Sequence, residues 1–240
     1  MDWKRTESCE VAAMNIGILT FPGVTQLDLT GPYEVFSRMP DTRVDLVWKT
    51  TEPVASDTGF ALQPTLALAT APAFDVIVVP GGPGQNDLMD DAVVLDFLRR
   101  QARSAQWVMS VCTGSLVLAA AGLLHGRRAA CHWLSLPLLE IFGTVPVAGR
   151  VVRDGQVLTT AGVSAGIDGA LALVAELQGR EQAELIQLMI EYDPQPLFDA
   201  GSPATAAPEL VERVRTFAAG FLDARRQAAE QAAELLETSR

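Results

Sequence analysis

The sequence predicts an α/β protein with a mainly parallel sheet that helices cover on both faces. Short apolar runs alternate with segments of helical spacing between residues 15 and 179. The runs are continuously apolar, whereas a strand with one face in water would alternate apolar and polar side chains. Strands and helices that alternate along a chain build a parallel sheet between two layers of helices.

Hydrophobic spacing places each element in chain order. Strands are expected at residues 15–21, 44–50, 75–80, 106–111 and 156–162, and helices at 92–102, 113–121, 166–179 and 209–237. Asp90 and Asp91 are placed to cap the first of these helices, and Gly122 can close the second. A Pro-rich connector, residues 191–208, precedes the last helix.

The last helix, from Glu209 to Glu237, carries an apolar stripe along one side that Arg225 interrupts. The stripe consists of Leu210, Val214, Phe217, Phe221, Ala228, Ala232 and Leu235. Such a stripe packs either on its own domain or on a second copy of the chain, and the pattern favours neither.

Length and composition indicate one large α/β domain with short extensions. A chain of 240 residues, of which 49% are hydrophobic, can bury a sizeable core. We expect residues 1–13 to be a mobile tail, because the run "MNIGILTFPG" that starts the fold begins at Met14. The domain is expected over 14–201, and the linker and C-terminal helix over 202–240.

The charge and the apolar runs exclude several classes of partner. A net charge of -11 argues against a nucleic-acid-binding surface, which is normally basic. No apolar run reaches the roughly 18–20 residues of a membrane span, and the N-terminus lacks the pattern of a signal peptide. We therefore expect a cytoplasmic protein in which Cys9, Cys112 and Cys131 are free thiols.

The loops after the strands are expected to meet at the carboxyl edge of the sheet, where open α/β sheets place their sites. In the first loop, "FPGVTQLDLTGPYEVF", Asp28 lies between two leucines. It either caps a helix that has Pro32 in its first turn, or points into the site from apolar surroundings that raise its pKa. The local pattern leaves both interpretations open.

A glycine pair and a cysteine follow two further strands. In "VPGGPGQND", Gly81 and Gly82 would let backbone N–H groups approach a ligand, although the spacing is not that of a dinucleotide-binding loop. In "SVCTGSLVLAAAGLL", Cys112 lies where a strand passes into a helix, whose N-terminus should lower the thiol pKa by about one unit. A lone cysteine is usually a small core residue, but its coincidence with Asp28 and the glycines favours a nucleophile.

Four segments resemble the PfpI-like branch of the class I glutamine amidotransferase-like superfamily. They are "LDLTGPYEVF", "VIVVPGGPG", "SVCTGSLVLAAAGLLHGRRAACHW" and "TTAGVSAGIDGAL". The resemblance runs from about Met14 to Gly201. Within that branch, "LMIEYDPQPLFDAGSP" (188–203) followed by a helix resembles the isonitrile-hydrating enzymes.

The resemblance implies a flavodoxin-like three-layer sandwich, a homodimer and no cofactor. The implied reaction is hydration of a small isonitrile to an N-substituted formamide through a cysteine thioimidate. By motif, Cys112 matches the nucleophile, Asp28 its acidic partner, Thr113 the residue that helps hold the site, Gly82 the backbone donor of the glycine turn, and Val163 the loop beside the cysteine.

The histidines depart from the pattern of the protease-like relatives, which carry His directly after the cysteine. Here that residue is Thr113, so no Cys-His pair is offered locally. His125 is interpreted as a helix-end residue, and His132 as a structural histidine or, alternatively, a group near the site. No His, Cys and Asp cluster has metal-ligand spacing, so no metal is expected.

Two alternatives stay open. One is a ligand-sensing transcription regulator, since this fold is also fused to DNA-binding domains, but residues 202–240 suggest one long helix, too little for a two-motif helix-turn-helix domain. The other is a glyoxalase, deglycase or redox-sensing thiol protein of the same superfamily. Those proteins act on polar carbonyls or peroxide and would favour polar pocket residues.

Overall fold

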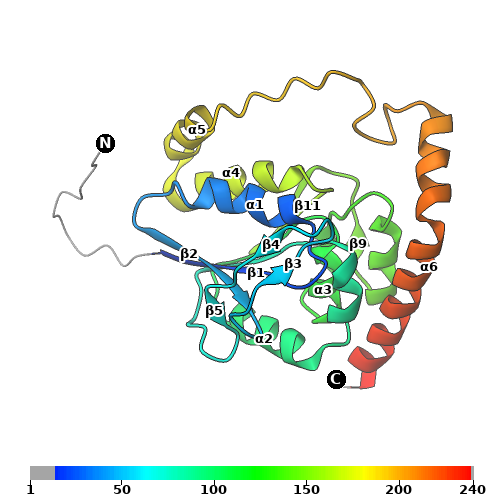
Figure 1. Ribbon diagram of the computed structural model, residues 1–240, viewed down its shortest axis with the longest axis horizontal. Coiled ribbons are helices and arrows are strands. Elements are labelled where there is room, and N and C mark those ends of the chain that lie inside the picture. The colour runs from blue at the N-terminus through cyan, green and yellow to red at the C-terminus, as the bar shows by residue number, and fades with distance from the viewer. Residues whose placement is uncertain (1–13, 239–240) are drawn as a thin grey trace.

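The computed structural model describes residues 14–238 and confirms the predicted α/β sandwich (Figure 1). The strands of the main sheet are β1 (Met14–Leu19), β2 (Thr42–Trp48), β5 (Leu66–Ala67), β6 (Val76–Val79), β7 (Trp107–Ser110), β10 (Val151–Asp154) and β11 (Val157–Thr160). Their order is β10-β11-β7-β6-β1-β2-β5. Every neighbouring pair is parallel except β10 with β11. The sequence analysis expected β11, within residues 156–162, but no strand at the position of β10.

The central strands are buried along their whole length. All four residues of β6 and all four of β7 are buried, as their continuous apolar runs predict. These two strands pair in parallel, with Val79 opposite Ser110 at their carboxyl ends. The loops that follow them therefore start side by side.

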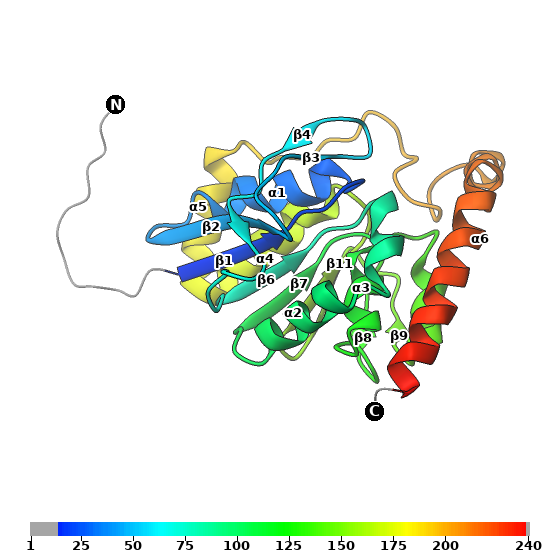
Figure 2. The same ribbon diagram turned by 60° about the horizontal axis from the view of Figure 1, so that its bottom comes forward.

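Helices cover both faces of this sheet (Figures 1 and 2). On one face α1 (Gln26–Phe36) packs against α4 (Ala165–Gln178), which also contacts α5 (Arg180–Met189). On the other face α2 (Ala92–Ala102) packs against α3 (Gly114–Ala120). Helix α2 has the predicted bounds, and its N-cap is Asp91, whose carboxylate accepts the N–H groups of Val93 and Val94 at 3.1 and 3.2 Å.

The remaining elements are short. They are β3 (Val54–Ala55), β4 (Ala61–Leu62), β8 (Arg128–Ala129), β9 (Val145–Pro146) and the 3₁₀ helices η1 (Pro83–Leu88) and η2 (Leu136–Phe142). Segments of this length carry too few residues to show a period, so the sequence analysis did not find them. One of them, η1, lies next to the site described below, as does the loop after β8.

Helix α1 begins earlier than the sequence analysis expected. Its N-cap is Thr25, so Asp28 lies inside the first turn and is not the cap, and Pro32 lies in the helix interior. The prediction was wrong because it took Pro32 as the first-turn residue. A Cβ on Gly166 would lie 3.1 Å from the Pro32 ring, so a glycine there lets α4 approach α1 closely.

The C-terminal helix α6 (Pro208–Thr238) lies across the molecule from α5, and the connector arches between them (Figures 1 and 2). Helix α6 packs against α3, η1 and η2. Its C-terminal half carries the buried residues Ala229 and Ala232, whereas Phe217 is 93% exposed. The apolar stripe thus packs on its own domain only in part. Residues 208–238 form one helix, and no helix-turn-helix occurs among residues 202–238.

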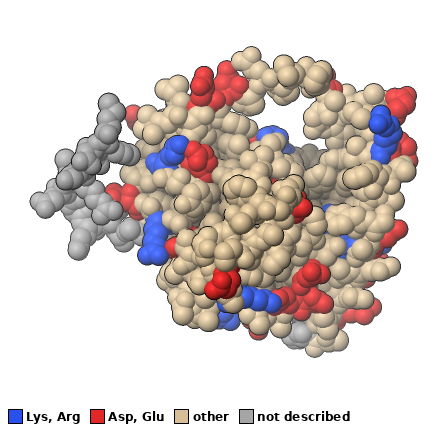
Figure 3. Space-filling view, viewed as in Figure 1, with Lys and Arg blue, Asp and Glu red and all other residues tan. Residues whose placement is uncertain are grey.

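The expected tail, residues 1–13, and Cys9 within it lie outside the described residues. None of the helices within residues 14–238 is long and apolar enough to cross a membrane. On the face shown in Figure 3, basic side chains are scattered among acidic ones and form no continuous patch.

Candidate active site

The candidate site lies at the carboxyl edge of the sheet, beside the point where the strand order reverses. Strand β1 leads to β2 on one side, whereas β6 pairs with the other side of β1. Open α/β sheets place their ligands at such a point. The structure brings the three predicted loops together here: the Gly81 N–H donates to Asp28 Oδ2 at 2.9 Å, and the Gly82 N–H donates to Thr113 Oγ1 at 3.1 Å.

Cys112 lies on a strained turn between β7 and α3. Its φ of 58° falls in the left-handed region, which non-glycine residues rarely adopt. Its N–H donates to the carbonyl of Ala161 at 3.0 Å, which ties the turn to the loop after β11. The side chain is only 5% exposed. This geometry is the predicted one for a side chain presented at a strand-to-helix turn.

The glycine pair is required by close packing. A Cβ on Gly81 would lie 2.5 Å from both the backbone nitrogen and Oγ1 of Thr113, and 2.9 Å from Asp28 Oδ2. Gly82 has a φ of 132°, which side chains other than hydrogen rarely tolerate. Because both N–H groups are used by Asp28 and Thr113, this loop holds the two side chains in place.

Backbone donors also surround the cysteine sulfur. The N–H groups of Val163 and Thr113 hydrogen-bond the Cys112 sulfur and favour its thiolate form. Val163 has a φ of 26°, so the loop after β11 is strained where it meets the cysteine. The sequence analysis placed Val163 in this loop by motif, and the structure places its N–H at the sulfur.

Asp28 and Cys112 form a buried acidic pair. Burial raises the pKa of Asp28 from 3.8 to about 7, although the Gly81 N–H and the Cys112 thiol both lower it. Burial first, and then the charge of Asp28, raise the pKa of Cys112 well above 9.0. The sequence analysis expected the helix N-terminus to lower the pKa of Cys112. That expectation was wrong, because the effect of burial on this pKa is larger than that of a helix of seven residues. The pair therefore holds one proton between about pH 7 and strongly alkaline pH.

One carboxyl oxygen of this pair is available to a reacting group. Asp28 is fully buried, and its Oδ1 accepts no hydrogen bond of normal geometry from residues 14–238. A buried carboxyl oxygen without a partner is unfavourable unless it serves another purpose. Oδ1 can therefore exchange a proton with the thiol or with a ligand.

Residues 14–176 match the DJ-1/PfpI family. The chain belongs to this family. An isonitrile hydratase from Pseudomonas putida is 53% identical over 224 residues, which are 93% of this chain and 98% of that protein. The glutathione-independent glyoxalase DJR-1.2 from Caenorhabditis elegans is 31% identical over 55% of this chain and 72% of its own length. A crystal structure of a THiJ/PfpI family protein from Pseudomonas syringae superposes with a TM-score of 0.88, at 40% identity over 91% of each chain.

The raised pKa of Asp28 in this DJ-1/PfpI protein predicts how stability depends on pH. Between pH 3.8 and about 7 the unfolded chain loses the Asp28 proton while the folded chain keeps it, so the wild type loses stability as pH rises. Asp28→Asn cannot titrate. Its free energy of unfolding should therefore increase relative to wild type across this window, by up to about 4 kcal/mol, and the difference should be constant above pH 7. Urea unfolding between pH 4 and 7.5 measures it.

The matched control for this measurement is Asp199→Asn, which removes an exposed carboxyl in the connector. Its stability curve should run parallel to that of the wild type. A parallel curve for Asp28→Asn as well would show that the folded protein does not hold a proton at this position.

His132 lies near the site as a neutral ring. A Cβ on Gly162 would lie 2.6 Å from the His132 ring, so the imidazole packs against the residue before Val163. Its Nδ1 accepts the Leu134 N–H at 3.3 Å. Burial and the positive charge of Arg225 lower its pKa. The structure thus supports a packed, uncharged His132, and His125 lies elsewhere, against the carbonyl of Phe142 at 3.1 Å.

Cys131 is the other described cysteine. Cys112 and Cys131 are both free thiols. Burial raises the pKa of Cys131 to about 12, so it stays a thiol at neutral pH. Residues 14–238 contain no group of three or more His, Cys, Asp or Glu side chains that could hold a metal.

Arg225 is the residue near the site that sequence reasoning missed. The sequence analysis treated it as an interruption of the apolar stripe, yet it is only 4% exposed. The sequence did contain one sign that Arg225 is buried. It is a single cation within an apolar stripe of helical spacing, and a residue at such a position faces the same interior as its apolar neighbours. Only the path of α6 in three dimensions shows what it contacts.

Proposed function

We propose that the protein is an isonitrile hydratase, which adds water to a small isonitrile and releases an N-substituted formamide. The observation that carries this proposal is the 53% identity with the Pseudomonas putida isonitrile hydratase over 98% of that protein's length. The buried pair of Cys112 and Asp28 supports it, because this pair offers a nucleophile and a proton source without a histidine.

The first step forms a covalent bond to sulfur. The thiol proton passes to Asp28, and the Cys112 thiolate attacks the terminal carbon of the isonitrile. A carbon–sulfur bond forms, negative charge develops on that carbon, and Asp28 delivers the proton to it. The product is a thioimidate, R–N=CH–S–Cys112. The N–H groups of Val163 and Thr113 stabilise the thiolate before the attack.

The second step releases the product. Water adds across the carbon–nitrogen double bond, so that nitrogen gains a proton and carbon gains a hydroxyl group. The carbon–sulfur bond then breaks as the hydroxyl oxygen becomes a carbonyl oxygen. The sulfur leaves as thiolate, and the proton released by the hydroxyl group returns to the pair of Asp28 and Cys112. The balance is one isonitrile and one water consumed for each formamide.

The burial of the site suits this substrate class. Cys112 is 5% exposed and belongs to the buried apolar core, which also contains Val79, Val111 and Leu116. A charged or strongly hydrated substrate would lose much of its solvation there, whereas an isonitrile is uncharged and has a narrow reacting end. We therefore propose that selectivity favours small apolar isonitriles over polar carbonyl compounds.

A side-by-side assay tests this proposal. Purified protein is incubated with cyclohexyl isocyanide or with methylglyoxal, and formation of N-cyclohexylformamide or of lactate is followed. We expect formamide formation at least about 100-fold faster than lactate formation. The glyoxalase function is the second candidate, because the Caenorhabditis elegans glyoxalase is 31% identical over 55% of this chain. Rapid lactate formation without formamide would favour that candidate instead.

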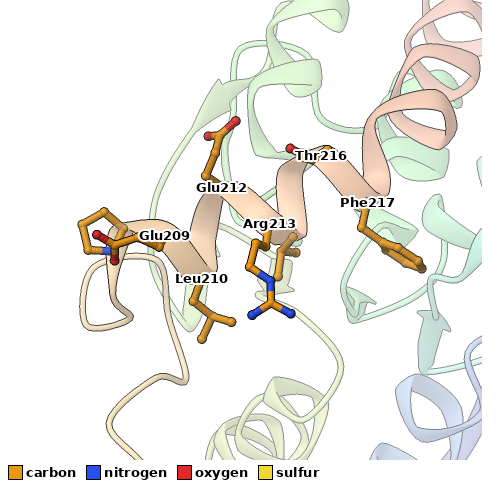
Figure 4. A pocket seen from close by; sticks show the side chains of 8 residues that line it. Glu209, Leu210, Glu212, Arg213, Thr216 and Phe217 are labelled. Carbon is orange, nitrogen blue, oxygen red and sulfur yellow. The ribbon is translucent and has the colours of Figure 1, made fainter.

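We further propose that the protein is a homodimer whose contact includes the connector and the first half of α6. These segments carry several large apolar side chains that are almost fully exposed, whereas apolar residues on a protein surface are usually scattered singly. Exposed fractions are 90% for Leu197, 79% for Phe198 and 93% for Phe217. The first half of α6 lines an open cleft of about 940 Å³, and Leu210 and Phe217 project to the same side as Arg213 (Figure 4).

This proposal predicts an effect of charge in the exposed apolar segment. Phe198→Glu combined with Phe217→Glu should convert a dimer into a monomer, because two buried carboxylates would face apolar surface. Sedimentation velocity measures the change. Val93→Glu is the control, since Val93 is an exposed apolar residue on α2. A wild-type chain that sediments as a monomer would end the dimer proposal.

A further inference from the structure

Arg225 on α6 is a buried cation that has only neutral partners. It is 4% exposed, and no carboxylate of residues 14–238 lies within ion-pair distance of it. Its Nε donates to Asn86 Oδ1 at 3.1 Å and its Nη1 donates to Ser135 Oγ at 2.7 Å. The guanidinium carbon also lies 4.3 Å from the centre of the Phe221 ring. A buried arginine is normally paired with a carboxylate, so this arrangement needs a physical reason.

The Asn86 contact leads to the glycine loop. Asn86 lies in η1, and it also accepts a hydrogen bond from the side-chain amide of Gln85. The Gln85 N–H donates to the Gly82 carbonyl at 3.2 Å, and Gly82 in turn donates to Thr113. Arg225 is therefore linked through three residues to the side chain that follows Cys112.

The Ser135 contact leads to the other flank of the cysteine. The Ser135 N–H donates to the carbonyl of His132 at 2.8 Å. The same loop is held at Ala130, whose carbonyl accepts the Ser115 hydroxyl of α3 at 2.6 Å. Ser115 also hydrogen-bonds Ser110 at the end of β7, at 2.8 Å. The guanidinium group thus contacts the loop after β8 at Ser135, and α3 holds the same loop at Ala130.

We infer that Arg225 is a positioning residue of the site: its guanidinium joins the loop after β6 to the loop after β8 and keeps a buried positive charge between these two loops. Neutral partners are central to this inference. Asn86 and Ser135 satisfy the N–H groups without cancelling the charge, whereas a carboxylate would cancel it. The kinetic part of the inference rests on the proposed function, but the effect on the thiol does not.

The charges around the sulfur support this role. Asp28 faces Cys112 from α1, and its charge raises the pKa of the thiol. The charge of Asp57 raises the pKa of Asp28. Cys131 and His132 lie on the loop after β8, and the charge of Arg225 lowers the pKa of both. Ionised Cys131 and Cys112 raise the pKa of Arg225 in return. The guanidinium is the cation that α6 contributes to this cluster. Cys112 raises the pKa of Arg225, and because such an interaction is mutual it also favours the Cys112 thiolate, by less than burial and Asp28 oppose it.

The position of α6 explains how the charge is held. Ala229 and Ala232 lie one and two turns beyond Arg225 and are fully or almost fully buried. Helix α6 packs there against α3, η1 and η2, which carry or adjoin the loops that Arg225 joins. The C-terminal extension therefore completes the site from outside the sandwich.

The experiment compares Arg225→Gln with Arg226→Gln, which removes an exposed charge from the same helix. The first readout is the rate of Cys112 alkylation by iodoacetamide between pH 6 and 10, with the modified residue located by mass spectrometry. Arg225→Gln should raise the apparent thiol pKa and slow alkylation at pH 7 by about tenfold. Arg226→Gln should follow the wild type. The second readout is formamide formation, in which kcat should fall by about 100-fold with little change in KM.

Two further variants separate charge from packing. Arg225→Lys keeps the charge but loses the two-armed contact, so it should restore the alkylation profile but only part of kcat. Asn86→Asp leaves α6 and Arg225 in place and pairs the guanidinium with a carboxylate. Asn86→Asp should raise the pKa of the Cys112 thiol while the melting temperature stays level or rises. This variant therefore tests the inference even if Arg225→Gln fails to fold.

Wild-type alkylation profiles in both Arg225→Gln and Asn86→Asp would overturn the inference. So would equal slowing in Arg225→Gln and Arg226→Gln, since the effect would then be that of net charge alone. Alkylation does not require an isonitrile. If the wild type fails to form formamide, the proposed function fails, while the alkylation profiles still decide the role of Arg225.

Discussion

Cys112→Ala is expected to lower the rate of formamide formation by at least about 10⁴-fold, because it removes the nucleophile of the proposed thioimidate mechanism. Cys131 is not expected to substitute for it, since the hydrogen bond with the Asp28 carboxyl is made by Cys112 and not by Cys131. The variant should fold, because the substitution removes one buried sulfur atom and costs about 1–2 kcal/mol. Formamide is measured by chromatography, and circular dichroism reports the fold.

The proposed covalent intermediate gives an independent readout. With a slow isonitrile, the wild type should gain the mass of the substrate on Cys112, and mass spectrometry should find no adduct on Cys9 or Cys131. Cys131→Ala, which removes a buried sulfur from the neighbouring loop, should still form the adduct on Cys112. Turnover in Cys112→Ala close to the wild-type rate would remove the covalent mechanism.

Asp28→Asn should cut the rate of hydration by about 10²–10⁴-fold, the usual effect of losing a general acid. Asparagine keeps the size of the side chain but carries no transferable proton. The same variant should make the Cys112 thiol easier to ionise, because the charge of Asp28 is one of the causes that raise its pKa. The ultraviolet absorbance of the thiolate, titrated across pH, measures this second effect.

The combination of slower turnover with easier thiol ionisation is specific to a proton donor. A residue that only held the fold would not lower the thiol pKa when replaced. Asp28→Glu keeps the acid but moves it by one methylene group, so it should be impaired through misplacement. Near-wild-type turnover in Asp28→Asn would return the acid role to another group, with His132 the first to test.

The sequence alone determined the central sheet, since β6, β7 and α2 have strong local patterns. A continuous apolar run needs both faces covered, and Asp91 caps α2 through contacts within its own first turn. It also brought Asp28, the glycine pair and Cys112 to one edge, because residues after parallel strands share that edge. These features depend either on residues that are close in the chain or on the direction of the strands, and both can be inferred from local sequence patterns.

Only the tertiary structure decided how these residues are used. Asp28 acquires its raised pKa from burial, and its contact with Gly81 joins residues 53 positions apart. The thiol pKa of Cys112 moves opposite to the local expectation for the same reason, because burial depends on every element packed around the site. Arg225 reaches the site from 113 residues beyond Cys112, along a helix that a connector carries across the molecule. Spacing in the sequence records the face of a helix, but the partner of that face is set by long-range packing.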